Sequence, residues 1–198
     1  MTRRRLWLFV VVYSIVFITV IVWITVIRRR AHPATGGSAT SASTTTAAAP
    51  GRKINARLYF VSTDGTKLVG VDREVSYADG AAAQAQQIIA AQLAPVAPPL
   101  VSAIPPGTSL RALYLDTKGA AFVDVSKDAA SAHTGGTQDE LLTIYSIVNA
   151  LTANLPAITS VQVLVDGKEV ETLAGHIDLR KPLQKNLAII ESETPTAR

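Results

Sequence analysis

The feature that most constrains this chain is an uninterrupted apolar run near its start, LWLFVVVYSIVFITVIVWITVI at residues 6–27. The run contains no charged residue, glycine or proline. As a helix it would extend about 33 Å, enough to cross a hydrocarbon layer of about 30 Å. Trp7 and Trp23 lie near its two ends, where indole rings favour the membrane interface. The run therefore predicts one transmembrane helix over residues 6–27.

A cleaved signal peptide is the alternative interpretation of this run. The apolar region of a signal peptide spans about 7–15 residues and is followed by small residues at a cleavage site. Here the run is longer and is followed by Arg28, Arg29 and Arg30. These features favour an uncleaved anchor. Three arginines also precede the run, at residues 3–5, so the flanking charges do not determine its orientation.

A low-complexity segment follows the apolar run. Residues 31–51 consist almost entirely of Ala, Thr, Ser, Gly and Pro, without a periodic apolar face. Chains of this composition behave as flexible linkers, and one of this length has a root-mean-square reach of about 25 Å. We therefore predict a tether over residues 28–52 that holds a folded domain close to a membrane surface.

The charge of the chain changes at the same boundary. Residues 1–52 contain seven Arg and no Asp or Glu, which leaves 12 Lys and Arg against 15 Asp and Glu in residues 53–198, a net charge of −3. A nucleic-acid-binding domain needs a basic face, so no nucleic-acid partner is expected. Cysteine is absent. This excludes disulfides, thiolate zinc sites, thiol nucleophiles and lipid attachment to cysteine.

Apolar patterning predicts one folded domain over residues 53–187 and a disordered tail over 188–198. The fold class is α+β, with two helices against an antiparallel or mixed sheet in the order β-β-α-β-β-α-β-β. A proline-rich stretch, residues 94–107, is expected to be an extended, ordered loop. The predicted elements are strands at 54–62 and 67–76, a helix at 80–93, a hairpin at 109–126, a helix at 137–155, and two strands within 160–173.

The helix at 137–155 is the clearest amphipathic helix of this domain. Thr137 and Glu140 have the spacing of a capping box at its start. The apolar stripe expected to face the core is Leu141, Ile144, Tyr145, Val148, Leu151 and Leu155. An adjacent side is smaller and partly polar, and we expect it to be an exposed interaction surface formed by Leu142, Ser146, Asn149 and Ala153.

A histidine and a carboxylate lie close together near the end of the domain, where Gly175 is followed by His176 and Asp178. A metal site at this point would need a third ligand such as His133, brought in by folding. A hydrolase would need an activated nucleophile, but the chain has no G-x-S-x-G motif and Ser146 lies inside a predicted helix. The structural interpretation is favoured, in which Gly175 permits a turn and His176 hydrogen-bonds to backbone. We therefore expect no catalytic residue, metal or cofactor.

The stretches LYFVSTDGTKLVGVDREV, LLTIYSIVNAL and VQVLVDGKEVETLAGHIDL resemble the GerMN domain family, over about residues 55–183. The family takes its name from a bacterial sporulation and germination protein. The resemblance implies a small α+β fold similar to the ring-building motifs of secretion systems, no catalytic residues, and a location of the domain outside the cytoplasmic membrane, which places residues 1–5 on the cytoplasmic side. This chain lacks the cysteine of lipoprotein members and has one copy of the domain where the namesake has two. Its closing run carries a structural signature, Asp166, Gly167, Gly175, His176 and Asp178.

These features predict a non-enzymatic domain, anchored in the cytoplasmic membrane and exposed on the extracytoplasmic (periplasmic or outer) side. It would bind an envelope protein or self-associate, with a link to sporulation or germination. Two alternatives remain: a module that binds peptidoglycan or another cell-wall ligand, and an enzyme that uses His176.

Overall fold

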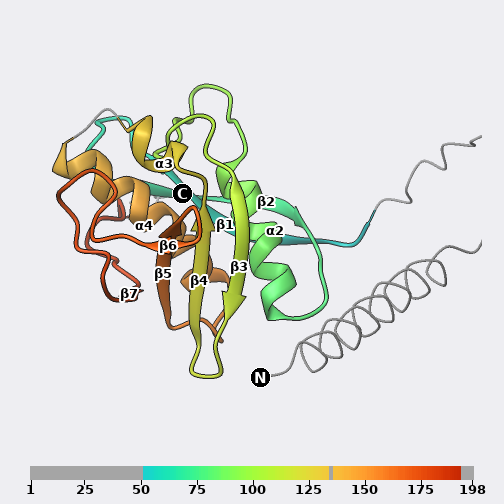
Figure 1. Cartoon of the computed structure of the whole chain (residues 1–198). Helices are drawn as coiled ribbons and strands as arrows, with labels where there is room; N and C mark the ends of the chain where they lie inside the picture. The colour runs from blue at the N-terminus through green and yellow to red at the C-terminus, as the bar shows by residue number, and fades with distance from the viewer. Residues whose placement is uncertain (1–50, 134–135, 193–198) are drawn as a thin grey trace, which may run out of the picture. The chain divides into compact units, whose positions relative to one another are not determined.

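The computed structural model describes residues 51–133 and 136–192 (Figure 1). The predicted membrane run 6–27, nearly all of the predicted tether 28–52, and residues 193–198 lie outside the described residues. Within the ranges that the structure describes, no helix combines the length and apolar character needed to span a membrane.

The order of elements confirms the predicted α+β class. Both predicted helices and all six predicted strands are present, and the structure adds the short helix α3 and the short strand β7 to the predicted set. The elements are β1 (Lys53–Val61), β2 (Leu68–Ser76), α2 (Ala81–Leu93), β3 (Leu110–Leu115), β4 (Ala120–Val125), α3 (Asp128–Ser131), α4 (Thr137–Asn154), β5 (Ser160–Val165), β6 (Lys168–Glu169) and β7 (Leu183–Gln184).

The strands form two sheets, whereas the sequence pattern predicted one. Strands β1 and β2 pair only with each other as an antiparallel hairpin among the named strands, with Lys53 opposite Ser76. The second sheet has the order β3-β4-β5-β6, and β7 also pairs with β5. Strands β4 and β5 are parallel, because the chain crosses between them through α3 and α4. The prediction of a single sheet was wrong because alternation within a strand does not record which strand lies beside it.

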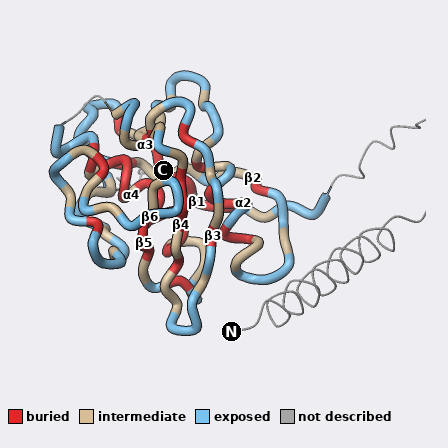
Figure 2. Tube along the Cα trace, in the orientation of Figure 1, coloured by how far each residue is buried: buried red, intermediate tan, exposed pale blue. Residues whose placement is uncertain are grey.

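Helix α4 lies at the centre of the core, in contact with α2, β1, β5 and β7. Figure 2 shows that most of this helix is buried. A helix that is covered on several sides has no single core stripe. Within the predicted stripe, Leu141 and Tyr145 are only half-buried, whereas the neighbouring Leu142 is 2% exposed.

The predicted interaction surface on α4 is therefore wrong. Leu142, Ser146 and Asn149 are buried, and Ala153 is half-buried. At Asn149 the physical reason is that the C-terminal segment covers the helix. Asn149 Nδ2 donates to the carbonyl oxygen of Asn186 at 2.9 Å, and Asn186 N donates to Asn149 Oδ1 at 3.0 Å.

The same segment corrects the predicted tail. Beyond Leu187 the chain returns to β2, where Leu68 N donates to the carbonyl of Ile189 at 2.8 Å and Glu191 N donates to the carbonyl of Leu68 at 2.7 Å. Residues 188–192 therefore belong to the folded domain. The proline-rich segment 94–107 forms a loop without a regular helix, and Val61 N donates to the carbonyl of Val101 at 2.9 Å. It is not extended throughout as predicted, because Leu100 N donates to the carbonyl of Ala97 and Thr108 N to the carbonyl of Pro105, which makes two turns.

Candidate functional site

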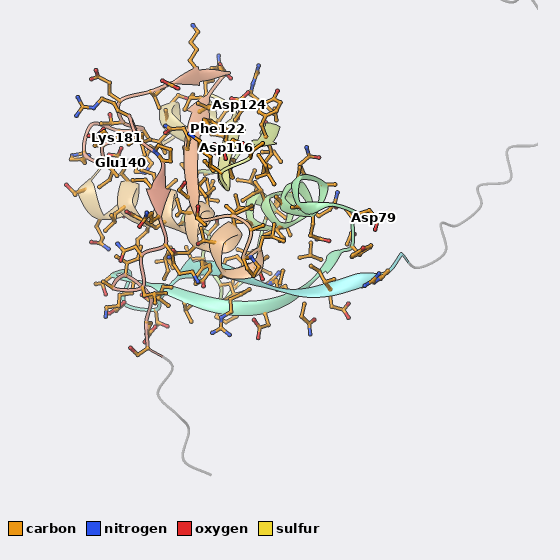
Figure 3. All side chains as sticks on the ribbon, turned by 90° about the horizontal axis from the view of Figure 1, so that it is seen from below. Asp79, Asp116, Phe122, Asp124, Glu140 and Lys181 are labelled. Carbon is orange, nitrogen blue, oxygen red and sulfur yellow. The ribbon has the colours of Figure 1, made fainter. Side chains whose placement is uncertain are left out.

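The loop that contains His176 is built around a carboxylate from a distant helix. Glu140, in the first turn of α4, has no exposed surface. Its Oε1 accepts hydrogen bonds from the backbone N–H groups of Leu173 at 2.8 Å and Ala174 at 3.0 Å. Its Oε2 accepts the backbone N–H of His176 at 2.8 Å and lies 3.0 Å from His176 Nδ1. Figure 3 labels Glu140 among the surrounding side chains.

The backbone of this loop turns so that its donors converge on the carboxylate. Gly175 has φ 98°, a left-handed conformation that glycine adopts without a steric penalty. Gly175 N donates to Thr172 Oγ1 at 2.9 Å, and Leu179 N donates to the carbonyl of Glu171 at 2.7 Å, which closes the loop. The turn predicted at Gly175 is therefore present.

The electrostatics of Glu140 fit an anchor for this loop. Burial would raise the pKa of its carboxyl group, but backbone N–H donors from residues 173, 174, 176 and 177 outweigh burial, so the pKa is lowered from its ordinary value. The ionised carboxylate is therefore the form that the loop stabilises. The sequence analysis expected His176 to bond to backbone, whereas its side chain bonds to Glu140.

Glu140 also does not act as half of a capping box. The N-cap of α4 is Gly136, which has no side-chain cap, and Thr137 is already the first residue of the helix. The capping-box prediction was wrong because Glu140 is used by the loop at residues 173–177 and does not turn back on its own helix.

Asp178 makes a separate, exposed ion pair. Its carboxylate accepts hydrogen bonds from Arg180 Nε at 2.9 Å, Arg180 Nη2 at 2.8 Å and the backbone N–H of Arg180 at 3.0 Å. The Arg180 side chain holds the pKa of Asp178 well below its ordinary value. His176 and Asp178 therefore have different partners. They share only a small hollow of about 170 Å³, lined by Glu171, Thr172, His176, Asp178 and Arg180.

The histidines do not assemble into a metal site within the described residues. No group of three or more His, Asp or Glu side chains in this part of the chain is arranged to hold a metal ion. The Nε2 atom of His133 lies 3.3 Å from Thr143 Oγ1 instead. The structure thus does not bring His133 together with His176 and Asp178 as a ligand set.

The Asp166-Gly167 turn is present as predicted and joins β5 to β6. Both residues have positive φ, 48° and 75°, as a two-residue type I′ hairpin requires. Gly167 N donates to Oδ1 of the buried Asp124 at 2.7 Å. Arg111 bridges the two acids, with Nε 3.2 Å from Asp124 Oδ2 and Nη1 3.4 Å from Asp166 Oδ1. The sequence did not identify Asp124 in advance. The feature that could have done so is its position as the single charged residue in the otherwise apolar strand β4.

Two larger grooves are lined in part by the proline-rich loop. Both volumes are within the range of about 300–1,000 Å³ that is usual for ligand sites. The first, of about 340 Å³, includes Val61, Val101, Pro105, His133, Asp139 and Thr143. The second, of about 390 Å³, includes Leu93, Val96, Pro98, Leu100, Val101 and Ile104. Val101, which is 58% exposed, borders both grooves.

Comparisons with known proteins agree with this fold. The family model Germane, described as sporulation and spore germination, matches residues 57–171. The first GerMN domain of the sporulation protein GerM from Bacillus subtilis has a TM-score of 0.52 at 17% identity, over 66% of this chain and 97% of that one. The tandem GerMN domains of the same protein give a TM-score of 0.50 at 16% identity, over 69% of this chain and 46% of that one.

Comparison with curated proteins gives no match. At these identities, the two GerM structures establish the fold alone. The family model, in contrast, covers more than half of the sequence. The chain therefore belongs to the Germane family of sporulation and spore germination, and its folded part is a GerMN-type domain.

Proposed function

We propose that this protein is a non-enzymatic, membrane-anchored interaction domain of the bacterial cell envelope, which binds a protein partner or assembles with itself. The description of the family, sporulation and spore germination, supports a link of the protein to these processes. In this proposal residues 6–27 anchor the chain in the cytoplasmic membrane, and the GerMN-type domain lies on the extracytoplasmic side.

The observation that most supports an interaction role is the structural use of the His176 loop. His176 is held by the buried Glu140, and Asp178 is held by Arg180. The hollow that these two side chains share has a volume of only about 170 Å³, below the range of about 300–1,000 Å³ that is usual for ligand sites. Two large apolar side chains are also exposed, Tyr114 at 60% and Val101 at 58%. Exposed apolar side chains of this kind are common at protein interfaces.

The topology can be tested directly. Alkaline phosphatase fused after Arg198 should be active, and protease added to intact spheroplasts should remove the domain. Protection of the domain in intact spheroplasts, followed by digestion after lysis, would contradict the extracytoplasmic assignment.

The assembly role can be tested on the full chain in its native membranes. Chemical crosslinking should give discrete products larger than the single chain. The isolated residues 53–198 should be monomeric at micromolar concentration, because membrane tethering raises the effective concentration of weak contacts. A full chain that gives no crosslinked product under any condition would count against this function.

The grooves beside the proline-rich loop favour a second candidate, a cell-wall ligand binder. In this case purified peptidoglycan should sediment with the protein. Replacement of Val101 by Lys should abolish the binding, because Val101 borders both grooves. Under the first proposal neither the protein nor the variant sediments with peptidoglycan.

A further inference from the structure

The first of the two grooves at the proline-rich loop contains an acid without a partner in the domain. Its volume is about 340 Å³, and Asp139 is the only acid among the described residues that line it. Asp139 is exposed in the first turn of α4, and no described residue makes a hydrogen bond or ion pair with its carboxylate. A helix N-terminus favours an acid in any case, so Asp139 alone does not indicate a ligand.

The walls of the first groove are largely apolar. Leu142 and Ile104 are buried members of the hydrophobic core that reach this groove. The half-buried Val61 and the exposed Val101 add aliphatic surface. Within the described lining there is no Lys or Arg that could neutralise Asp139. The groove therefore combines an aliphatic wall with one negative charge, which is complementary to an alkyl chain that ends in an ammonium group.

The histidine of this groove is held by a neighbouring threonine. Thr143 Oγ1 donates its single hydrogen to the carbonyl of Ala103. Towards His133 Nε2, which lies 3.3 Å away, the same oxygen can therefore only accept, so Nε2 carries a proton. Thr143 is buried, so this contact ties the imidazole to the core.

The second groove adjoins the first along the proline-rich loop. The two share five lining residues, Val101, Ser102, Ile104, Pro105 and Pro106. Of the described residues around the second groove, none is charged. Neither lining includes Phe, Tyr or Trp in this part of the chain. Aromatic side chains supply the flat faces on which another ring can stack. The grooves therefore suit a flexible chain better than the sugar rings of a glycan strand.

We propose that the first groove binds the free amino group of a peptidoglycan stem peptide. The inference rests on the second candidate function, binding to the cell wall, and deepens it by naming the part of the wall that is recognised. The ammonium group meets Asp139, and the aliphatic chain that carries it packs against Leu142 and Ile104. The continuing peptide lies in the uncharged second groove.

The size of the grooves favours a stem peptide over a folded protein partner. Their volumes, about 340 and 390 Å³, are those of small-ligand sites. A stable protein–protein interface instead covers about 800 Å² of each partner. A lysine side chain of a protein partner has the same chemistry as the stem-peptide amine, so the experiments must separate these two sources.

Acetylation of peptidoglycan tests the amino group apart from the rest of the ligand. Acetic anhydride converts each free amine into an uncharged amide and leaves the aliphatic chains in place. The full chain, purified in detergent, should sediment with untreated peptidoglycan and bind the acetylated preparation about fivefold more weakly, as expected for the loss of an exposed ion pair. Equal affinity for the two preparations would overturn the recognition of an amine, although cell-wall binding would stand.

Asp139→Asn tests the same contact from the side of the protein. It should weaken binding to untreated peptidoglycan about fivefold and leave binding to the acetylated preparation unchanged, because the two changes remove the same interaction. Glu169→Gln removes an equal charge at an exposed position of β6 outside both grooves, and it should bind like the parent chain. Both variants should keep the melting temperature of the parent chain. Equal losses for the two variants would mean that net charge, and not the groove, decides the binding.

Failure of the cell-wall function has a different result. In that case the parent chain sediments with neither preparation, and the inference fails with the function on which it rests. If Asp139→Asn then also removes the crosslinked products of the full chain in native membranes, while Glu169→Gln retains them, the groove takes a protein partner and the stem peptide is the wrong ligand.

Discussion

Nδ1 of His176 lies 3.0 Å from Oε2 of Glu140, and the backbone nitrogen of His176 donates to the same oxygen at 2.8 Å. Through this contact the first turn of α4 holds a loop 36 residues further along the chain. The carboxylate is buried, while the histidine side chain is 38% exposed. The histidine therefore closes a loop over a buried anion.

Glu140→Gln should lower the free energy of unfolding by about 2–3 kcal/mol. Glutamine offers one acceptor oxygen where the carboxylate offers two, so at least one buried N–H group loses its partner. Urea denaturation measures the loss, and hydrogen exchange at Leu173, Ala174 and His176 should accelerate. Asp139→Asn, at an exposed neighbouring acid, is the control and should change stability by less than about 0.5 kcal/mol. Equal effects of the two variants would mean that Glu140 does not anchor the loop.

His176→Ala should have a smaller effect, about 1 kcal/mol, because backbone donors still satisfy Glu140 after the imidazole is removed. The folded variant should keep any binding or assembly of the parent protein. Thermal unfolding and crosslinking of the full chain measure the two properties. Loss of assembly at unchanged stability would point instead to a direct functional role for His176.

The stability of the domain should decrease in acid, in part through Glu140. Its pKa is lowered in the folded state, so its contribution is complete above the pKa of the unfolded chain, about 4.3, and is lost as the pH falls through the folded value. Urea midpoints measured from about pH 7 to pH 3 should fall less steeply for Glu140→Gln than for the parent domain. If the urea midpoints of the two proteins fell by the same amount over this pH range, Glu140 would not be responsible for the loss of stability in acid.

Asn149→Ala should cost about 1–3 kcal/mol, since it leaves both the N–H and the C=O of Asn186 without their side-chain partner. The chain after Asn186 continues to its pairing with Leu68, so the amide of Leu68 should also exchange faster. Asn55→Ala, at an exposed position on β1, serves as the control and should be nearly neutral. Unchanged exchange at Leu68 would show that the C-terminal segment does not depend on Asn149.

The sequence by itself determined the local elements of this domain. Alternating apolar residues predicted β1 to β5 within a few positions, helical spacing predicted α4, and Asp166-Gly167 predicted the β5–β6 turn. Each of these signals follows from local backbone geometry. Side chains alternate with a period of two residues in a strand and of about 3.6 residues in a helix, and a two-residue type I′ turn needs positive φ at both positions.

Only the tertiary structure decided which segments cover one another. It split the strands into two sheets, buried Asn149 under the C-terminal segment, and turned Glu140 toward a loop 36 residues away. The physical reason is that a periodic pattern records the alternation of side chains along one element. The burial of a polar side chain, and the pairing of a strand edge, depend on contacts with segments that are distant in sequence.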